Sequence, residues 1–242
     1  METLIGEEIG RGAFGTVYVK KDDPSLCIKV SNKSGTSCRQ WSNEYNKIMN
    51  LEKLINKTHI YNKIKLVRII IPQKFVETGS YCYMIIPRIF RPEGKDYNPT
   101  LQAQIGNKSG RIIHKGRGEF ISLKEIREYM DEKDLEIACF ELGIMMSLIH
   151  HYGKNDAYDI ELYLGKEANS KKCRFYIADF DLSEEIKEYN EDTYERIVWS
   201  LTAIPYFPRK SVDPKLYEEF RRGYSSIIPK EISDKIFEDY DD

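Results

Sequence analysis

Three closely spaced glycines near the start of the chain are the first residues with a recognisable chemistry. Gly10, Gly12 and Gly15 follow one short apolar run, and Val17 lies in the next. Because glycine has no Cβ, its backbone can approach phosphate oxygens closely. The same spacing in dinucleotide-binding folds leads into a helix, whereas residues 16–20 continue here as a strand pattern. We therefore predict a glycine-rich loop between two strands, either over a phosphate-bearing ligand or as a simple hairpin turn.

A lysine inside an apolar strand pattern follows this loop. Lys29 lies in the run Cys27–Val30, where an unpaired ammonium is costly. A helical pattern farther along the chain carries Glu44. We expect Lys29 to form an ion pair with Glu44 and to face nucleotide phosphates. The alternative is an edge-strand lysine that reaches solvent.

Strand patterns that position these residues fill most of the first ninety residues. They occur at residues 4–9, 16–20, 26–30, 66–71, 73–77 and 81–86. One helical pattern interrupts them at residues 40–55. Beyond residue 92 the patterns are mainly helical, and Ser122 and Glu125 have the spacing of a capping box. The later patterns are helices at 134–150, 193–203, 214–224 and 229–240, and a strand at 174–178.

Composition and charge exclude several classes of function. The 37 Lys and Arg residues and 39 Asp and Glu residues give a net charge of −2, which argues against general attraction to nucleic acid or anionic membranes. No apolar run reaches the ~18 residues of a membrane span, and the polar start shows no secretory pattern. Five scattered cysteines without a CxxC pair indicate free thiols in a reducing compartment, not a disulfide framework or zinc site. We expect a soluble, intracellular, cytoplasmic protein.

A basic stretch at residues 111–118 allows two interpretations. It is either a patch that binds phosphate or a partner, or a solvated hairpin or loop. The absence of interleaved aromatic residues favours the hairpin or loop.

Taken together, the N-terminal motifs resemble those of the protein kinases. The run Gly-Arg-Gly-Ala-Phe-Gly-Thr-Val at 10–17 is similar to their glycine-rich loop, and Cys-Ile-Lys-Val at 27–30 to their strand lysine motif. Residues 42–49 look like the helix that supplies the paired glutamate, and residues 83–89 like the strand that enters the hinge. The resemblance implies an ATP site formed by Ile9, Gly10, Gly12, Phe14, Gly15, Val17, Lys29, Ile86, Pro87 and Ile89.

The run Phe-Tyr-Ile-Ala-Asp-Phe-Asp at 175–181 resembles the strand that enters the metal-binding DFG motif. The resemblance implies that Asp179 is a metal ligand. Asp181 stands where glycine is usual, so the φ freedom that helps this motif to flip is lost.

Residues 154–161 have the spacing of the kinase catalytic loop. The resemblance puts Asp156 in the position of the catalytic base and Glu161 in place of the metal-binding Asn. A carboxylate there can still ligate Mg²⁺ or Mn²⁺. Asp159 is the alternative base if the loop is shifted. Asn155 replaces the usual Arg, so docking of a phosphorylated activation loop at that position is not expected.

The resemblance implies an α+β, bilobal protein-kinase-like fold. We predict an N-lobe at residues 1–86, with a five-stranded sheet and one helix, a hinge at 87–91, and a reduced, mainly helical C-lobe at 92–242. A weaker resemblance rests on the Asp-Phe-Asp motif and the Tyr-Phe-Pro-Arg run at 206–209, which look like a compact kinase-like family described mainly in fungi.

The expected function is ATP-dependent transfer of the γ-phosphoryl group to a hydroxyl, with Mg²⁺ or Mn²⁺ as cofactor and a protein as acceptor or partner. A small-molecule acceptor is compatible with the short C-lobe. The alternative is a pseudokinase that acts through protein partners. The intact glycine-rich loop, Lys29, Glu44, Asp156 and Asp179 favour the enzyme. Glu161, Asp181, the missing Arg and the short C-lobe favour the alternative.

Overall fold

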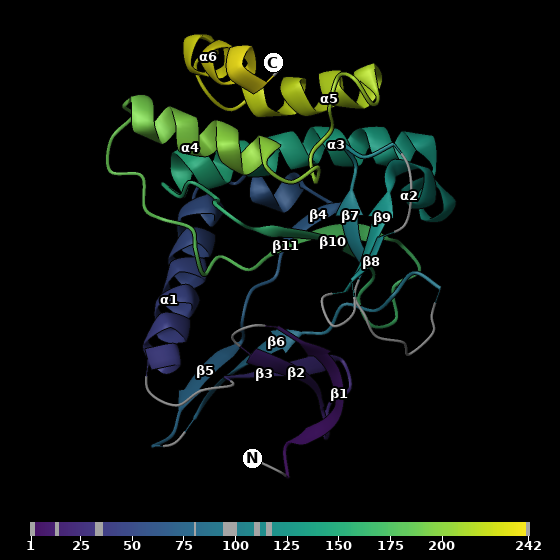
Figure 1. Ribbon diagram of the computed structural model, residues 1–242, viewed down its shortest axis with the longest axis vertical. Coiled ribbons are helices and arrows are strands. Elements are labelled where there is room, and N and C mark those ends of the chain that lie inside the picture. Colours follow the sequence, from purple (N-terminus) through teal and green to yellow (C-terminus); the bar gives the residue numbers. More distant parts are fainter. Residues whose placement is uncertain are drawn as a thin grey trace.

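The chain is described by a computed structural model over residues 3–12, 15–31, 36–79, 81–93, 101–108, 112–114 and 118–240. The described residues form an α+β structure with one sheet of five strands and a second sheet of six. The smaller sheet lies at one end of the molecule, and helix α6 lies at the opposite end, beyond the second sheet (Figure 1).

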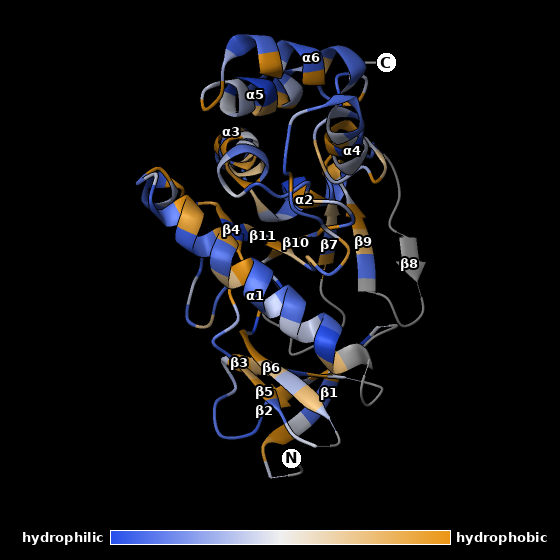
Figure 2. Cartoon of the chain, turned by 90° about the vertical axis from the view of Figure 1, so that its left-hand side faces the viewer, coloured by the Kyte–Doolittle hydropathy of each residue, from blue (hydrophilic) through white to orange (hydrophobic). Residues whose placement is uncertain are grey.

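The five-stranded sheet has the order β1-β2-β3-β6-β5, with all neighbours antiparallel. Its strands are β1 (Ile5–Arg11), β2 (Gly15–Lys20), β3 (Leu26–Ser31), β5 (Lys74–Glu77) and β6 (Cys82–Pro87). Helix α1 (Thr36–Asn56) follows β3 and extends from this sheet toward the rest of the molecule (Figures 1 and 2). A sheet of five strands with one long helix was predicted for this part of the chain and is confirmed.

The described residues after position 92 are mainly helical, as predicted, and they also contribute strands to a second sheet. This sheet has the order β4-β11-β10-β7-β9-β8. Its strands are β4 (Val67–Ile69), β7 (Leu101–Gln104), β8 (Ile112–His114), β9 (Gly118–Ser122), β10 (Glu161–Gly165) and β11 (Arg174–Ala178). Strand β4 lies at the strand pattern predicted for residues 66–71, and it pairs in parallel with β11. The physical reason is burial, since Val67 and Ile69 are 0% and 5% exposed within the main core.

The helices cover one side of the second sheet (Figure 1). They are α2 (Leu123–Tyr129), α3 (Glu132–Ser147), α4 (Glu191–Thr202), α5 (Pro214–Ser225) and α6 (Lys230–Tyr240), with a 3₁₀ turn at Tyr61–Lys63 and a π-helical turn at Leu148–Tyr152. The predicted capping box forms between Ser122 and Glu125 at the start of α2. Gly143 of α3 and Gly223 of α5 lie against the opposite helix, where an added Cβ would meet a backbone carbonyl. These two glycines therefore allow α3 and α5 to pack closely.

The hairpin interpretation of the basic stretch agrees with the pairing of β8 and β9. The two strands are antiparallel, with His114 opposite Gly118. Residues 111 and 115–117 lie outside the described residues.

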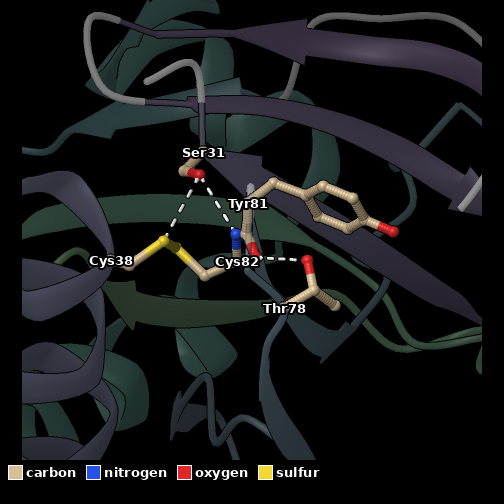
Figure 3. The surroundings of a disulfide bond; sticks show 5 residues. All are labelled: Ser31, Cys38, Thr78, Tyr81 and Cys82. Atoms are coloured by element: carbon tan, nitrogen blue, oxygen red, sulfur yellow. Dashed lines mark hydrogen bonds between the residues drawn. A yellow bond between two sulfur atoms is a disulfide. The ribbon is translucent and has the colours of Figure 1, made fainter. Parts of the chain in front are cut away.

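A disulfide joins helix α1 to strand β6 (Figure 3). Cys38 and Cys82 are 44 positions apart in sequence, and their Cα atoms are 5.5 Å apart. The Cys82 N–H donates to Ser31 Oγ at 3.4 Å. The prediction of free thiols is therefore wrong for this pair, because the start of α1 packs on β6 beside Trp41 and Met84. The free cysteines are Cys27, Cys139 and Cys173.

The main apolar core lies between the second sheet and the helices that cover it, with Leu142, Phe175 and Phe220 fully buried in it. Figure 2 shows apolar residues on α3 and on strands of the second sheet. A search of the described residues found no helix with both the length and the apolar character that a membrane crossing requires.

Candidate functional site

The glycine-rich turn lies at the end of the β1–β2 hairpin. Gly10 is opposite Val17 in the strand register, and the Gly12 N–H donates to the Gly15 carbonyl at 2.8 Å. A Cβ on Gly15 would lie 2.5 Å from the Trp41 ring, so this glycine is required by packing. The predicted contact residue Phe14 lies outside the described residues.

Lys29 lies between two carboxylates that come from distant parts of the chain. Its Nζ is 3.7 Å from Glu44 Oε1 on α1 and 3.4 Å from Asp179 Oδ1 after β11. The same Nζ is 5.1 Å from the centroid of the Trp41 ring. Burial lowers the pKa of Lys29, but the carboxylates, above all Asp179 and Glu44, outweigh it and raise the pKa above its ordinary value. The structure thus brings Lys29, Glu44 and Asp179 together.

Glu44 is buried, with 3% of its surface exposed. Burial raises the pKa of this carboxyl to about 7, and the Lys29 ammonium opposes the rise only in part. Its Oε2 atom has no hydrogen-bond partner among the described residues. The ionised form of Glu44 is therefore poorly solvated in this position.

The Asp179-Phe180-Asp181 turn is tied to helix α1 by a lysine that the motif search did not single out. Lys47 Nζ donates to the carbonyls of Phe180 and Asp181, both at 3.0 Å, and to that of Ser183. Asp179 itself has a left-handed backbone with φ of 62°. Such a conformation is uncommon outside glycine, although aspartate tolerates it better than most residues. Lys47 therefore helps to hold the turn in the form that points Asp179 at Lys29.

Glu161 begins strand β10, where it is opposite Ala178, the residue before Asp179. Gln102 Nε2 donates to Glu161 Oε1 at 3.0 Å, and the Tyr163 hydroxyl donates to Oε2. Burial and the nearby Asp179 carboxylate raise the pKa of Glu161 to about 7, against the hydrogen bond from Tyr163. Glu161 and Asp179 are thus neighbours at the end of two paired strands.

Two carboxylates could form part of a divalent cation site here. Asp179 and Glu161 provide hard oxygen donors, which suit Mg²⁺ or Mn²⁺. No group of three or more His, Cys, Asp or Glu residues that could hold a metal occurs in the described ranges. Mg²⁺ is usually bound through one or two protein carboxylates together with phosphate and water ligands.

Asp156 is buried within its loop, with 2% of its surface exposed. Its Oδ1 accepts hydrogen bonds from the Tyr158 and Glu184 N–H groups at 3.1 and 2.7 Å, and its Oδ2 accepts one from Arg196 Nε at 2.7 Å. These contacts fasten the loop to the segment after β11 and to α4. The role of Asp156 as the catalytic base stays a prediction.

Asp159 is the exposed carboxylate of the same loop. Its backbone is left-handed, with φ of 59°. Partial burial of the carboxyl group and the Asp179 carboxylate raise the pKa of Asp159. Asp159, which the sequence left open as the alternative base, is thus the solvent-accessible carboxylate of this loop, whereas Asp156 is buried.

The predicted hinge residues lie where the two parts of the chain meet. Ile86 and Pro87 end strand β6, opposite Cys27 and Leu26 of β3. Ile89 follows them and contacts Gly165 at the end of β10. Ile9, Val17, Ile86, Pro87 and Ile89 are all partly exposed.

A shallow cavity of about 280 Å³ lies elsewhere in the described part of the chain. It is lined by Tyr129, Met130, Asp131, Asp134, Lys171, Lys172 and Cys173. None of the predicted site residues lines it.

Three residues of the site gave no motif signal of their own in the sequence: Lys47, Gln102 and Arg196. Lys47 lies one helical turn after Glu44, so its place on the same face of α1 follows from helix geometry. The other two reach the site only through tertiary contacts. No protein-family model matches the sequence, and no curated protein matches it.

Proposed function

We propose that this chain is a phosphotransferase of the protein kinase type, on a compact bilobal fold, which transfers the γ-phosphoryl group of ATP to a hydroxyl. One observation carries the proposal. Lys29 lies within 4 Å of both Glu44 and Asp179, although Lys29 and Asp179 are 150 positions apart. A partly buried cation between two carboxylates suits the binding of a triphosphate with its cation.

Each part of the site has a role in this proposal. The glycine-rich turn covers the phosphates, and Lys29, oriented by Glu44, contacts the α- and β-phosphates. Asp179 and Glu161 would hold Mg²⁺ or Mn²⁺, which, when bound, neutralises phosphate charge. Catalysis then rests mainly on positioning and charge neutralisation.

Asp159 accepts the proton of the acceptor hydroxyl in this proposal. Its raised pKa increases its affinity for that proton relative to an ordinary aspartate. Asp156 instead fixes the loop through the backbone of Glu184 and the guanidinium of Arg196. A protein hydroxyl and a small-molecule hydroxyl both fit this chemistry.

The second candidate is a pseudokinase that binds nucleotide and acts through partners. The occupied oxygens of Asp156 favour it, because the residue in the usual base position is engaged in structure. Both candidate functions use the same nucleotide site, and they differ in whether the protein transfers the phosphoryl group.

Intact mass measurement after incubation with ATP and Mg²⁺ or Mn²⁺ tests the proposal. We expect added phosphate on the wild type or on a generic basic protein, and none with Asp179→Ala. Asp159→Asn should slow transfer by roughly 10²-fold or more while the protein stays folded. Asp156→Asn should mainly lower stability.

A thermal shift assay with ATP separates the candidates. Nucleotide stabilisation that Lys29→Ala abolishes, without transfer by the wild type, would favour the pseudokinase. Stabilisation that is unchanged in Lys29→Ala would refute the site itself.

A further inference from the structure

A chain of hydrogen bonds joins the segment after α4 to the Glu161 carboxylate. The Tyr206 hydroxyl donates to Gln102 Oε1 at 3.0 Å, and Gln102 Nε2 donates to Glu161 Oε1 at 3.0 Å. Tyr163 donates to the other oxygen of Glu161. Gln102 and Tyr206 are each 3% exposed, so water does not compete freely for these bonds.

The chemistry of the Gln102 amide gives this chain a direction. An amide nitrogen only donates, and an amide oxygen only accepts. With Nε2 directed at a carboxylate, Oε1 faces the other way and accepts the proton of Tyr206. The Tyr206 hydroxyl therefore favours the orientation of Gln102 that presents an N–H to Glu161.

Two strands and one glycine bring these residues together. Gln102 on β7 is opposite Tyr163 on β10, and Glu161 lies two residues before Tyr163 on the same strand. Beyond β7, the Gly106 N–H donates to the Pro205 carbonyl at 3.0 Å. A Cβ on Gly106 would lie 2.5 Å from the Phe207 carbonyl oxygen, so only glycine allows this close approach.

We propose that Tyr206, Gln102 and Tyr163 are positioning residues that fix the Glu161 carboxylate for a divalent cation shared with Asp179. The inference rests on the proposed function. Each donor occupies one side of one Glu161 oxygen, which leaves the remaining lone pairs for the cation. Glutamate has one more rotatable bond than the asparagine usual in kinases, so it needs more restraint to hold a ligand geometry.

The structure thus gives a role to two segments that the kinase resemblance did not explain. Residues 101–104 supply Gln102, and residues 205–209 supply Tyr206. Both converge on the one residue that departs from the usual metal-binding pair.

Two matched hydroxyl deletions test this proposal. Tyr206→Phe removes the donor to Gln102. Tyr240→Phe is the control, because the Tyr240 hydroxyl is also buried and donates to Pro208, in the same segment, at 2.6 Å. Gln102→Met is a second variant that removes the link while it keeps a long side chain.

The measured quantity is the Mn²⁺ concentration that gives half-maximal thermal stabilisation by a non-hydrolysable ATP analogue, repeated with Mg²⁺. We expect this concentration to rise about fivefold in Tyr206→Phe and in Gln102→Met, the loss that one hydrogen bond predicts. In Tyr240→Phe the half-maximal metal concentration should stay within about twofold of the wild-type value, even if this variant loses as much stability as Tyr206→Phe.

The outcomes separate this inference from the proposed function. The inference alone would be overturned if metal-dependent stabilisation by the nucleotide analogue is lost in Asp179→Ala but is unchanged in Tyr206→Phe and Gln102→Met. A wild type that the metal–nucleotide pair does not stabilise would overturn the proposed function, and the inference with it.

Discussion

Replacement of Glu44 by glutamine should stabilise the free protein at pH 8, although it removes one partner of the Lys29 ion pair. Loss of one partner usually leaves a buried charge without compensation. Here Lys29 retains Asp179 at 3.4 Å, which is closer than Glu44 at 3.7 Å. Glutamine has nearly the shape of a protonated glutamate, so the packing of α1 is preserved.

The pKa of Glu44 determines the magnitude and the sign of the expected change in the free energy of unfolding. Its folded-state value of about 7 lies above the ordinary value of 4.5. A raised carboxyl pKa means that the folded state binds the proton more tightly than the unfolded chain does. The corresponding stability is therefore fully present below pH 4.5 and is lost as the pH rises through about 7. A difference from 4.5 to about 7 corresponds to about 3 kcal/mol as an upper bound.

Urea denaturation without nucleotide or metal, at pH 4.5, 6 and 8, measures this effect. Glu44→Gln should match the wild type at pH 4.5 and exceed it by up to about 3 kcal/mol at pH 8. Glu52→Gln, at a partly exposed position on the same helix, is the control and should show no such divergence. A Glu44→Gln variant that is less stable than the wild type at pH 8 would refute the reasoning, because the ion pair would then be worth more than the desolvation of Glu44.

Two further predictions concern how α1 is fastened. Lys47→Met should lower the free energy of unfolding by about 1–2 kcal/mol, since three carbonyls lose a charged donor. Lys47→Met should also speed amide exchange at residues 180–183. The control is Lys53→Met, at an exposed position of the same helix, which should change neither the free energy of unfolding nor this exchange. Equal effects of the two variants would contradict the role of Lys47. Reduction of the Cys38–Cys82 bond, which closes a loop of 44 residues, should lower stability by up to about 4 kcal/mol in the chain-entropy model. The urea midpoint should therefore fall with reductant in the wild type but not in Cys38→Ser, and a reductant-independent wild type would count against a formed bond.

Local chemistry allowed much of the fold to be predicted. The strand and turn patterns of the first ninety residues correctly located strands and one helix, and the kinase resemblance correctly implied a five-stranded sheet there. The Ser122 and Glu125 pair correctly predicted the start of α2. These features depend on residues that are close in sequence, so their spacing alone carries the information.

Strand pairing over long distances was not predictable in the same way. The pattern at β4 identifies a strand but not its partner, which is β11, more than a hundred residues later. The partner is decided by which apolar surface buries Val67 and Ile69. The disulfide between Cys38 and Cys82 likewise depends on where α1 packs.

For the candidate site, the sequence by itself determined which residue types are present, and the tertiary structure decided what each one faces. Local sequence patterns drew attention to Lys29 and Glu44, and the kinase resemblance implied roles for Glu161 and Asp179. Only the folded arrangement buried Asp156 against Arg196, left Asp159 exposed, and connected Tyr206 to Glu161 through Gln102. The exposure and the hydrogen-bond partners of a side chain depend on how the whole chain packs. Contacts between residues a hundred positions apart produce no local sequence pattern, so the sequence alone could not predict them.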